Sequence, residues 1–266
     1  MSEGSCHGPV QALVLAGERQ GGNALARALG LKASVFAEVE GRRALERVLD
    51  ALRQSTSIQS GLLVGPDCSD AAIEDVLRPM LADGYFRWLP PAAGPCASAL
   101  SGVAELESMP ILLTAGDHAL LTSELVNDFC LKALAQPGDL IVGLVPYALV
   151  KTRWPQSQRT VLRFRGGAYC GANLFLLKTA EARKVLFFWQ QIEQDRKHPW
   201  RIARKLGGLS LARYALGWLS LDQALAGLSR KCAAHIGYVL IHDPRAAVDV
   251  DTLEDLALAN EVLRNE

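Results

Sequence analysis

The sequence lacks the features that mark several large classes of protein. No apolar run approaches the roughly 20 residues that a membrane-spanning helix needs. The first nine residues are polar and small and contain no apolar stretch of the kind found in signal peptides. The formal net charge is zero, so the total charge does not favour a nucleic-acid binder. We therefore expect neither a membrane span nor a nucleic-acid partner.

Close cysteine pairs are also missing. The six cysteines are scattered along the chain, at Cys6, Cys68, Cys96, Cys130, Cys170 and Cys232. Zinc-thiolate sites usually need a close pair, so we do not expect one. Single cysteines spread in this way are typical of buried, reduced thiols, which indicates a cytoplasmic protein.

Short apolar runs alternate with helical patterns in a chain of 266 residues that is 50% hydrophobic. This alternation predicts an α/β protein with a parallel sheet covered by helices. The predicted strands are 12–16, 62–65, 86–89, 111–114, 140–145, 161–164, 173–177 and 235–242. The predicted helices are 43–54, 70–81, 96–107, 122–134, 179–195, 200–206, 221–228 and 252–263.

The second half of the chain is less regular than the first. Gly166 and Gly167 separate the apolar runs 161–164 and 169–177, which indicates a β-hairpin or a sheet insertion. No linker-like composition marks a boundary, so we expect a single domain over 1–266. Residues 147–229 are expected to form its acceptor-side half.

A glycine-rich, basic loop follows the first predicted strand. The strand ends at Leu15, Ala16 and Gly17, and the loop continues with Arg19, Gly21, Gly22 and then Lys32. Backbone N–H groups of glycines and nearby cations are suited to binding phosphates. An ordinary strand–helix connection is the alternative. The spacing fits neither the Rossmann fingerprint nor a P-loop.

Two further stretches place carboxylates near the ends of apolar segments. Asp117 follows the apolar run 111–114, and a lone Asp in that position can hold Mg²⁺ against nucleotide phosphates. The alternative is that Asp117 only caps a turn. Asp249 and Asp251 alternate with valines in an extended segment, so they should point to the same side. Helix capping explains Glu254 and Asp255 well but explains Asp249 poorly.

Together, these stretches resemble the nucleotidyltransferases of the glycosyltransferase-A-like fold. The resemblance is strongest to the molybdenum-cofactor guanylyltransferase-like, or MobA-like NTP transferase, group. It rests on the loop, on the run 114–122, on 249–256, on 94–100 and on 171–175, all in the family's order. Glu18 in place of the second glycine, the long approach to Lys32, and Ala119 and Leu253 in place of prolines depart from the family's pattern.

The resemblance implies a Rossmann-like three-layer α/β/α fold with a mixed, mainly parallel sheet. It also implies Mg²⁺-dependent transfer of a nucleoside monophosphate from an NTP to a phosphorylated small-molecule acceptor. Catalytic roles fall to Lys32, Asp117 and Arg19, and the metal would be held by Asp117, Asp249 and Asp251. Nucleotide contacts are implied for Leu15, Ala16, Gly17, Gly21, Gly22, Pro95 and Ser98. Asn173 would lie beside the acceptor. The base does not follow from the resemblance.

Arginines in the second half are candidates for the acceptor phosphate. Arg163 and Arg165 alternate with Leu162 and Phe164, so both should face away from the apolar side of their strand. Arginine contacts phosphate oxygens through two parallel hydrogen bonds, which makes these two residues our acceptor-binding predictions. A solvated basic surface is the alternative.

The stretch 185–218 combines aromatic and basic residues. Apolar residues at helical spacing most often pack in a core. A peripheral membrane contact and a homodimer interface stay open as alternatives.

Two other activities compete with nucleotidyl transfer. A nucleotide-sugar-dependent glycosyltransferase usually has an Asp-x-Asp in mid-chain, whereas here Asp249 and Asp251 lie near the C-terminus. A catalytically silent nucleotide-binding protein is the other alternative, and the altered loop at Glu18 keeps it open.

Overall fold

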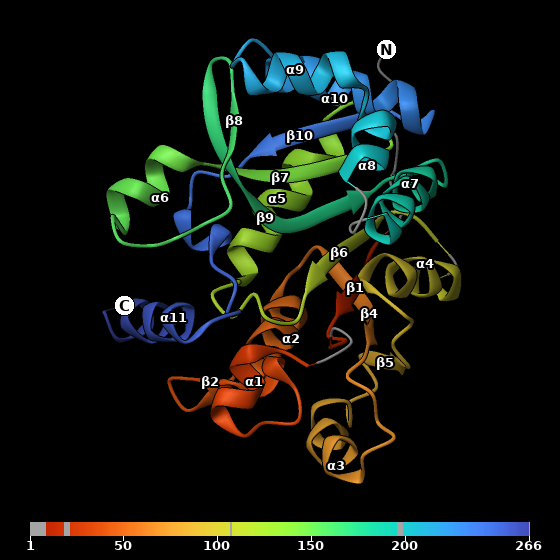
Figure 1. Cartoon of the computed structure of the whole chain (residues 1–266). Helices are drawn as coiled ribbons and strands as arrows, with labels where there is room; N and C mark the ends of the chain where they lie inside the picture. Colours follow the sequence, from red (N-terminus) through yellow and green to blue (C-terminus); the bar gives the residue numbers. More distant parts are fainter. Residues whose placement is uncertain (1–8, 19–21, 107, 196–198, 266) are drawn as a thin grey trace.

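The structure is a computed structural model that describes residues 9–18, 22–106, 108–195 and 199–265. Helices cover both faces of a central sheet, which gives three layers (Figure 1). The strands of this sheet are β1 (Val10–Leu15), β4 (Ile58–Val64), β5 (Phe86–Leu89), β6 (Ile111–Ala115), β7 (Leu140–Pro146), β8 (Leu162–Phe164), β9 (Gly167–Leu177) and β10 (Ile236–Leu240). A separate ribbon contains β2 (Glu38–Val39) and β3 (Arg42–Arg43).

The helices lie between these strands in the chain. They are α1 (Ala24–Leu29), α2 (Ala44–Gln54), α3 (Ala71–Met80), α4 (Pro95–Glu105), α5 (Ser123–Ala135), α6 (Tyr147–Arg153), α7 (Ala182–Gln194), α8 (Pro199–Leu206), α9 (Gly208–Ala215), α10 (Leu221–Cys232) and α11 (Leu253–Arg264). Two 3-10 turns, η1 (Ser34–Phe36) and η2 (Pro244–Ala247), complete the described elements. None of the described helices is both long and apolar enough to cross a membrane.

The sheet is mixed but mainly parallel, as the resemblance implies. Its order is β10-β7-β9-β6-β1-β4-β5, with β8 paired to β9. Strand β1 runs parallel to its neighbours β4 and β6, and β7 runs parallel to β10. Strand β9 runs antiparallel to both β6 and β7. The carboxyl ends of β1, β4 and β6 therefore meet at one edge, where open α/β sheets bind ligands.

Burial on both faces explains why β1 is apolar at every position from Ala12 to Leu15. Ala12 and Val14 face the core cluster shared with α2 and α5, whereas Leu13 faces the cluster shared with α4 and α7. A strand covered by helices on both sides needs apolar residues at every position instead of alternate ones. The same reasoning applies to β6, where Ile111, Leu112 and Leu113 are buried.

All eight predicted strands are present, with ends shifted by a few residues. The glycine pair at 166–167 lies in a β-hairpin, since Leu162 pairs with Tyr169 across β8 and β9. The sequence prediction missed α1, α6 and α9. Helices α1 and α6 have only six and seven residues, which is too short for the helical period to show. The assignment of 147–229 to an acceptor-side half stays a prediction. Strand β9, from that region, lies inside the sheet between β6 and β7.

Candidate functional site

A cavity of about 680 Å³ opens at the carboxyl ends of β1 and β6. The loop after β1, the N-terminus of α4, the middle of β9, the last turns of α7 and the segment 249–251 form its walls. Most of the residues predicted from sequence line it, namely Leu15, Ala16, Gly17, Pro95, Ser98, Asp117, Asn173, Asp249 and Asp251. The cavity is therefore the candidate functional site.

Backbone hydrogen bonds hold the loop after β1 between two neighbouring strands. The Ala16 N–H donates to the Val64 carbonyl at 2.9 Å, and the Gly116 N–H donates to the Leu15 carbonyl at 2.8 Å. Gly65 lies directly behind this loop with φ +81°, and a Cβ on Gly65 would come within 2.8 Å of the Gly17 Cα. Only glycine allows this close approach, so Gly65 determines where Gly17 sits.

We expect Gly65→Ala to destabilise the protein by about 3 kcal/mol, because the new Cβ would displace the Gly17 backbone. Gly84→Ala is the matched control. Gly84 also has a positive φ, +70°, but nothing lies within 4 Å of its added Cβ. Urea unfolding should show a loss of only about 1 kcal/mol for Gly84→Ala. Equal losses for the two variants would contradict the role assigned to Gly65.

A backbone hydrogen bond joins the two carboxylate stretches. The Val250 N–H donates to the Asp117 carbonyl at 3.0 Å, although the two residues are far apart in sequence. Asp249 and Asp251, on either side of Val250, both line the cavity, as their alternation with valine predicts. This contact brings the middle and late stretches to the same strand ends as the loop after β1.

Arg159 is a buried clamp that sequence reasoning did not assign to the site. Its guanidinium donates to Asp249 Oδ1 and to Asp255 Oδ1, each at 2.6 Å, and its side chain is only 6% exposed. Asp255 also accepts hydrogen bonds from the backbone of Thr252 and closes the capping box of α11. Arg159 therefore fixes the late carboxylate segment against the start of α11.

Asn173, on β9, contacts the Asp249 side chain. Its Nδ2 donates to Asp249 Oδ2 at 3.4 Å. Asn173 adopts φ +49°, a left-handed conformation that asparagine tolerates better than most residues. The conformation lies within β9, between two stretches that pair with β7 on either side of an irregularity. This left-handed conformation directs the Asn173 amide toward the cavity.

The N-terminus of α4 forms the opposite wall. Ser98 is buried, and its Oγ accepts a hydrogen bond from the Ala92 N–H at 2.9 Å. Glu193 reaches across from α7 and accepts from the Cys96 N–H at 3.4 Å. Burial, followed by the nearby Glu193 carboxylate, raises the pKa of the Cys96 thiol to about 12. Cys96 therefore stays protonated near neutral pH and is no nucleophile.

Glu18, the residue that departs from the family's glycine, turns back toward η1. Its carboxylate accepts from the Ser34 backbone N–H and, at 2.7 Å, from the Ser34 hydroxyl. Both residues line the cavity. Glu18 thus ties the loop after β1 to η1.

Several predicted residues do not line the cavity. The Lys32 ammonium pairs with Asp70 at 2.8 Å on the surface. Arg163 is exposed on β8, with its guanidinium 5.6 Å from the Tyr147 ring centroid. Arg165 is exposed as well, and Gly22 lies just outside the lining. Arg19 and Gly21 lie outside the described residues. The functional roles of all these residues stay predictions.

The described lining of the cavity is acidic. It contains Glu18, Asp117, Glu193, Asp249 and Asp251 but no lysine or arginine. The Thr114 hydroxyl, also in the lining, has no hydrogen-bond partner among the described residues. A polyanionic ligand would need cations to enter this cavity.

Helix α7 contributes residues that the sequence prediction also missed. Gln190, Glu193 and Gln194 line the cavity from its last turns. Their spacing of three and four residues places them on one face of the helix. These polar residues at helical spacing could have been recognised in the sequence, but they lie within a stretch dominated by aromatic and basic residues.

His118, next to Asp117, is buried at 1% exposure. Burial lowers the pKa of His118 to about 4, and the nearby Asp249 charge opposes this shift only in part. In the unfolded chain an imidazole titrates near pH 6.5, so between pH 6.5 and 4 the unfolded state binds more protons than the folded state. The contribution of His118 to the free energy of unfolding is therefore fully present above pH 6.5 and is lost as the pH falls toward 4.

Between pH 7 and pH 4, we expect the free energy of unfolding to fall by roughly 3 kcal/mol less in His118→Gln than in the wild type. Urea unfolding of both proteins across this range, with a metal chelator present, measures the difference. His242→Gln is the control, since His242 is exposed. Parallel stability–pH curves for wild type and His118→Gln would contradict the buried neutral imidazole.

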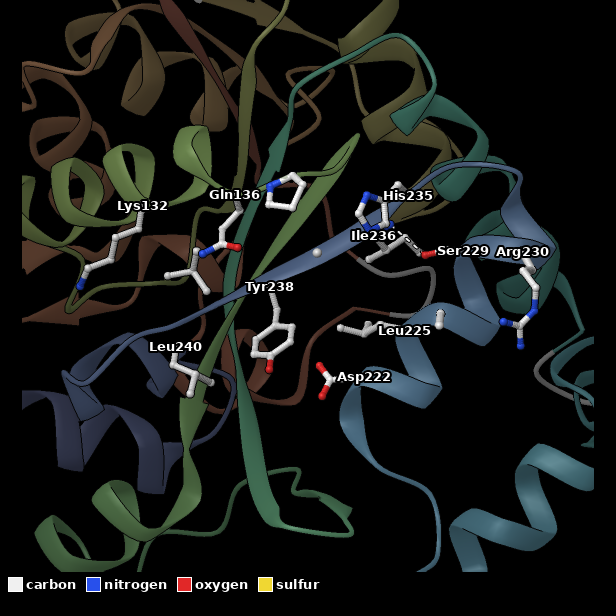
Figure 2. Close-up of a pocket in the computed structure, with 14 residues that line it drawn as sticks. Lys132, Gln136, Asp222, Leu225, Ser229, Arg230, His235, Ile236, Tyr238 and Leu240 are labelled. Carbon is white, nitrogen blue, oxygen red and sulfur yellow. Dashed lines mark hydrogen bonds between the residues drawn. The ribbon is translucent and has the colours of Figure 1, made fainter. Parts of the chain in front are cut away.

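A second cavity, of about 830 Å³, lies at the open edge of the sheet beside β10. Figure 2 shows the Tyr238 hydroxyl pointing toward Asp222 on α10, with Lys132 and Gln136 on the other side of the strand. Burial, with a smaller contribution from Asp222, raises the pKa of Tyr238. None of the residues singled out in the sequence lines this cavity, so it is not the candidate site.

Comparisons with known proteins assign the chain to a family and show which structures share its fold. The family model described as MobA-like NTP transferase domain matches residues 12–163. A structure from Thermus thermophilus, described as a hypothetical transferase, is 29% identical, with a TM-score of 0.78 over 93% of this chain and 99% of that one. No curated protein sequence matches the chain.

More distant structures share the fold. A 4-diphosphocytidyl-2C-methyl-D-erythritol synthase from Anaerococcus prevotii is 16% identical, with a TM-score of 0.59 over 96% of each chain. A CMP:2-keto-3-deoxy-manno-octonic acid synthetase, solved with CTP, is 10% identical, with a TM-score of 0.58 over 97% of this chain and 99% of that one.

Proposed function

The chain belongs to the family of MobA-like NTP transferase domains, and from this premise we propose that it transfers a nucleoside monophosphate from an NTP to a phosphorylated alcohol, sugar or cofactor precursor. The hydrogen bond from the Val250 N–H to the Asp117 carbonyl carries the proposal. It joins the family's middle and late stretches in one cavity with the loop after β1. A nucleotidyltransferase needs this combination, because phosphates and metal must meet at one place.

The proposed reaction needs no dedicated base. An oxygen of the acceptor phosphate attacks the α-phosphorus and forms a new P–O bond, while the bond to the β-phosphate bridging oxygen breaks and pyrophosphate leaves. The acceptor phosphate is already an anionic nucleophile near neutral pH. The chain's contribution is to position the two substrates and to stabilise charge.

The cavity residues suit these positioning tasks. The backbone from Leu15 to Gly17 would lie along the phosphates, and the Pro95–Ser98 turn of α4 would lie beside the base and ribose. Asn173 would lie beside the acceptor. The Thr114 hydroxyl, buried and without a partner among the described residues, is available to donate to a ligand.

Mg²⁺ fits the chemistry of this cavity. Its described lining carries five carboxylates and no lysine or arginine, so an NTP needs a bound cation to enter. Within the described part of the chain, no three His, Cys, Asp or Glu side chains are grouped to hold a metal by themselves. Mg²⁺ typically takes one or two carboxylates and fills the rest of its shell with phosphate oxygens and water. Asp117, Asp249 and Asp251 would supply the carboxylates, and the ion would neutralise phosphate charge.

Arg19 and Lys32 are proposed to supply the remaining positive charge. Lys32 pairs with Asp70 on the surface, where both groups are well exposed. Exposed ion pairs contribute little to stability, so the ammonium can leave Asp70 for a phosphate.

The test is a screen of four NTPs against sugar phosphates, polyol phosphates and phosphorylated cofactor precursors, with pyrophosphate as the readout. We expect release that requires one NTP, one acceptor and Mg²⁺, and that stops when EDTA is added. Release of a nucleoside diphosphate from a nucleotide-sugar instead would identify a glycosyltransferase. Mg²⁺-dependent NTP binding without turnover across the whole panel would identify a silent nucleotide-binding protein.

A further inference from the structure

Helix α9 presents an apolar face that no described part of the chain covers. None of its residues is buried. Leu209, Ala212 and Leu216 follow one another at spacings of three and four, which places them on one face. Leu209 is 78% exposed, and Trp218, just beyond the helix, is 61% exposed. These four residues are called the α9 face below.

The opposite side of α9 is anchored to the β8–β9 hairpin. The Tyr214 ring lies edge-on to Phe164 at 5.5 Å, and its hydroxyl accepts from the Arg163 N–H at 3.2 Å. The Arg165 N–H donates to the Leu219 carbonyl at 2.8 Å. These contacts fix how α9 is rotated about its own axis. Its apolar side therefore points away from the β8–β9 hairpin.

Positive charge is in excess in the segment that contains the α9 face. Residues 199–231 contain six cations (Arg201, Arg204, Lys205, Arg213, Arg230 and Lys231) against the single carboxylate of Asp222. Asp195 pairs with two of these cations, Arg201 at 3.5 Å and Lys205 at 2.8 Å. Even with Asp195 included, cations outnumber carboxylates here, in a chain whose net charge is zero.

Exposed tryptophan adds to this surface on α8, which packs beside α9 (Figure 1). The Trp200 side chain is exposed, and the guanidinium groups of Arg201 and Arg204 lie 5.3 and 5.6 Å from its ring centroid. The expectation that the aromatic residues of 185–218 pack in the core is therefore wrong for four of them, namely Phe187, Trp189, Trp200 and Trp218.

We propose that the α9 face, with Trp200 and the surrounding cations, docks peripherally on an anionic lipid bilayer. Leucine and tryptophan flanked by lysine and arginine are the residues of interfacial membrane surfaces. The apolar side chains would enter the headgroup boundary, and the cations would meet anionic headgroups.

Charge argues against a second copy of the chain as the occupant. In a two-fold dimer the same patch faces itself, so these cations would oppose one another. An anionic bilayer complements both the apolar and the basic residues. The surface also lies close to the candidate site, because α7 lines the cavity with Gln190 and Gln194 and leads toward α8. The proposal does not depend on which reaction the cavity performs.

Co-sedimentation of the full chain with vesicles tests this proposal. We expect binding to vesicles of equal parts phosphatidylglycerol and phosphatidylcholine, little binding to pure phosphatidylcholine, and weaker binding at high salt. The variant Leu209→Ser/Leu216→Ser should bind the anionic vesicles about tenfold less tightly, because two apolar anchors are lost.

Leu131→Ser/Leu253→Ser is the matched control. Leu131 on α5 is 73% exposed and Leu253 on α11 is 50% exposed, and both lie outside the α8–α9 region. This control should bind like wild type, and circular dichroism should show that both variants are folded. Absence of wild-type binding, or equal loss in the control, would overturn the proposal. Sedimentation velocity that reports a dimer disrupted by Leu209→Ser/Leu216→Ser would overturn it too, in favour of a second copy.

Discussion

Replacing Asp117 with asparagine is expected to lower pyrophosphate release about 10³-fold while leaving the fold intact. The substitution keeps the size of the side chain but removes a negative charge from the proposed Mg²⁺ site. The backbone carbonyl of residue 117 would still accept the Val250 N–H, so the late carboxylate segment stays in place. Activity and stability should therefore separate in this variant.

Steady-state kinetics with the best NTP and acceptor, across a Mg²⁺ titration, measure the effect. Asp128→Asn is the matched control, because Asp128 lies on the surface of α5 and pairs only locally with Lys132. Near-normal turnover by Asp117→Asn would rule out the metal assignment. A large loss in both variants would point to a general effect of charge instead.

Replacing Arg159 with methionine is expected to lower the free energy of unfolding by about 3–5 kcal/mol. The guanidinium is 6% exposed and serves two carboxylates, and the Asp255 side chain is only 13% exposed. Removing the cation leaves these charges partly buried without their partner, which costs more than the ion pair itself contributes. Arg159 acts as a positioning residue, so turnover should fall as Asp249 loses its orientation.

Urea unfolding compares this variant with Arg78→Met, which removes exposed ion pairs to Glu74 and Asp75. The control should change stability little, because surface pairs of this kind are screened by solvent. Arg159→Met/Asp255→Asn should recover part of the lost stability, since it removes one of the stranded charges. Equal effects of Arg159→Met and Arg78→Met would contradict a buried clamp.

Much of the fold follows from local patterns that the sequence displays. The strand run 12–16 is apolar at every position because β1 is covered on both faces, and this requirement leaves a direct trace in the residues. The predicted helices 122–134 and 252–263 match α5 and α11, and the Thr122 and Thr252 side chains cap these helices. Patterns of this kind arise within a few residues, so they can be recognised without the fold.

Much of the site depends on contacts between distant residues. Arg159 meets Asp249 and Asp255, which lie 90 and 96 positions further along the chain. The sequence pattern favoured Arg163 and Arg165, which alternate with apolar residues, but both remain on the surface and Arg159 is the buried one. Similarly, Lys32 follows the glycine-rich loop in the sequence, but its partner in the structure is Asp70.

The sequence by itself determined the alternation of strands and helices, the order of the family's motifs and the carboxylates at Asp117, Asp249 and Asp251. The strand pattern follows from burial along each strand, and the carboxylates can be recognised by their residue type. Both can therefore be found without knowing the fold. Only the tertiary structure decided which cations are buried, which aromatic rings stay outside, and that α7 forms a wall of the cavity. Those outcomes depend on packing between segments far apart in the chain, and the insertion of β9 between β6 and β7 brings such segments together.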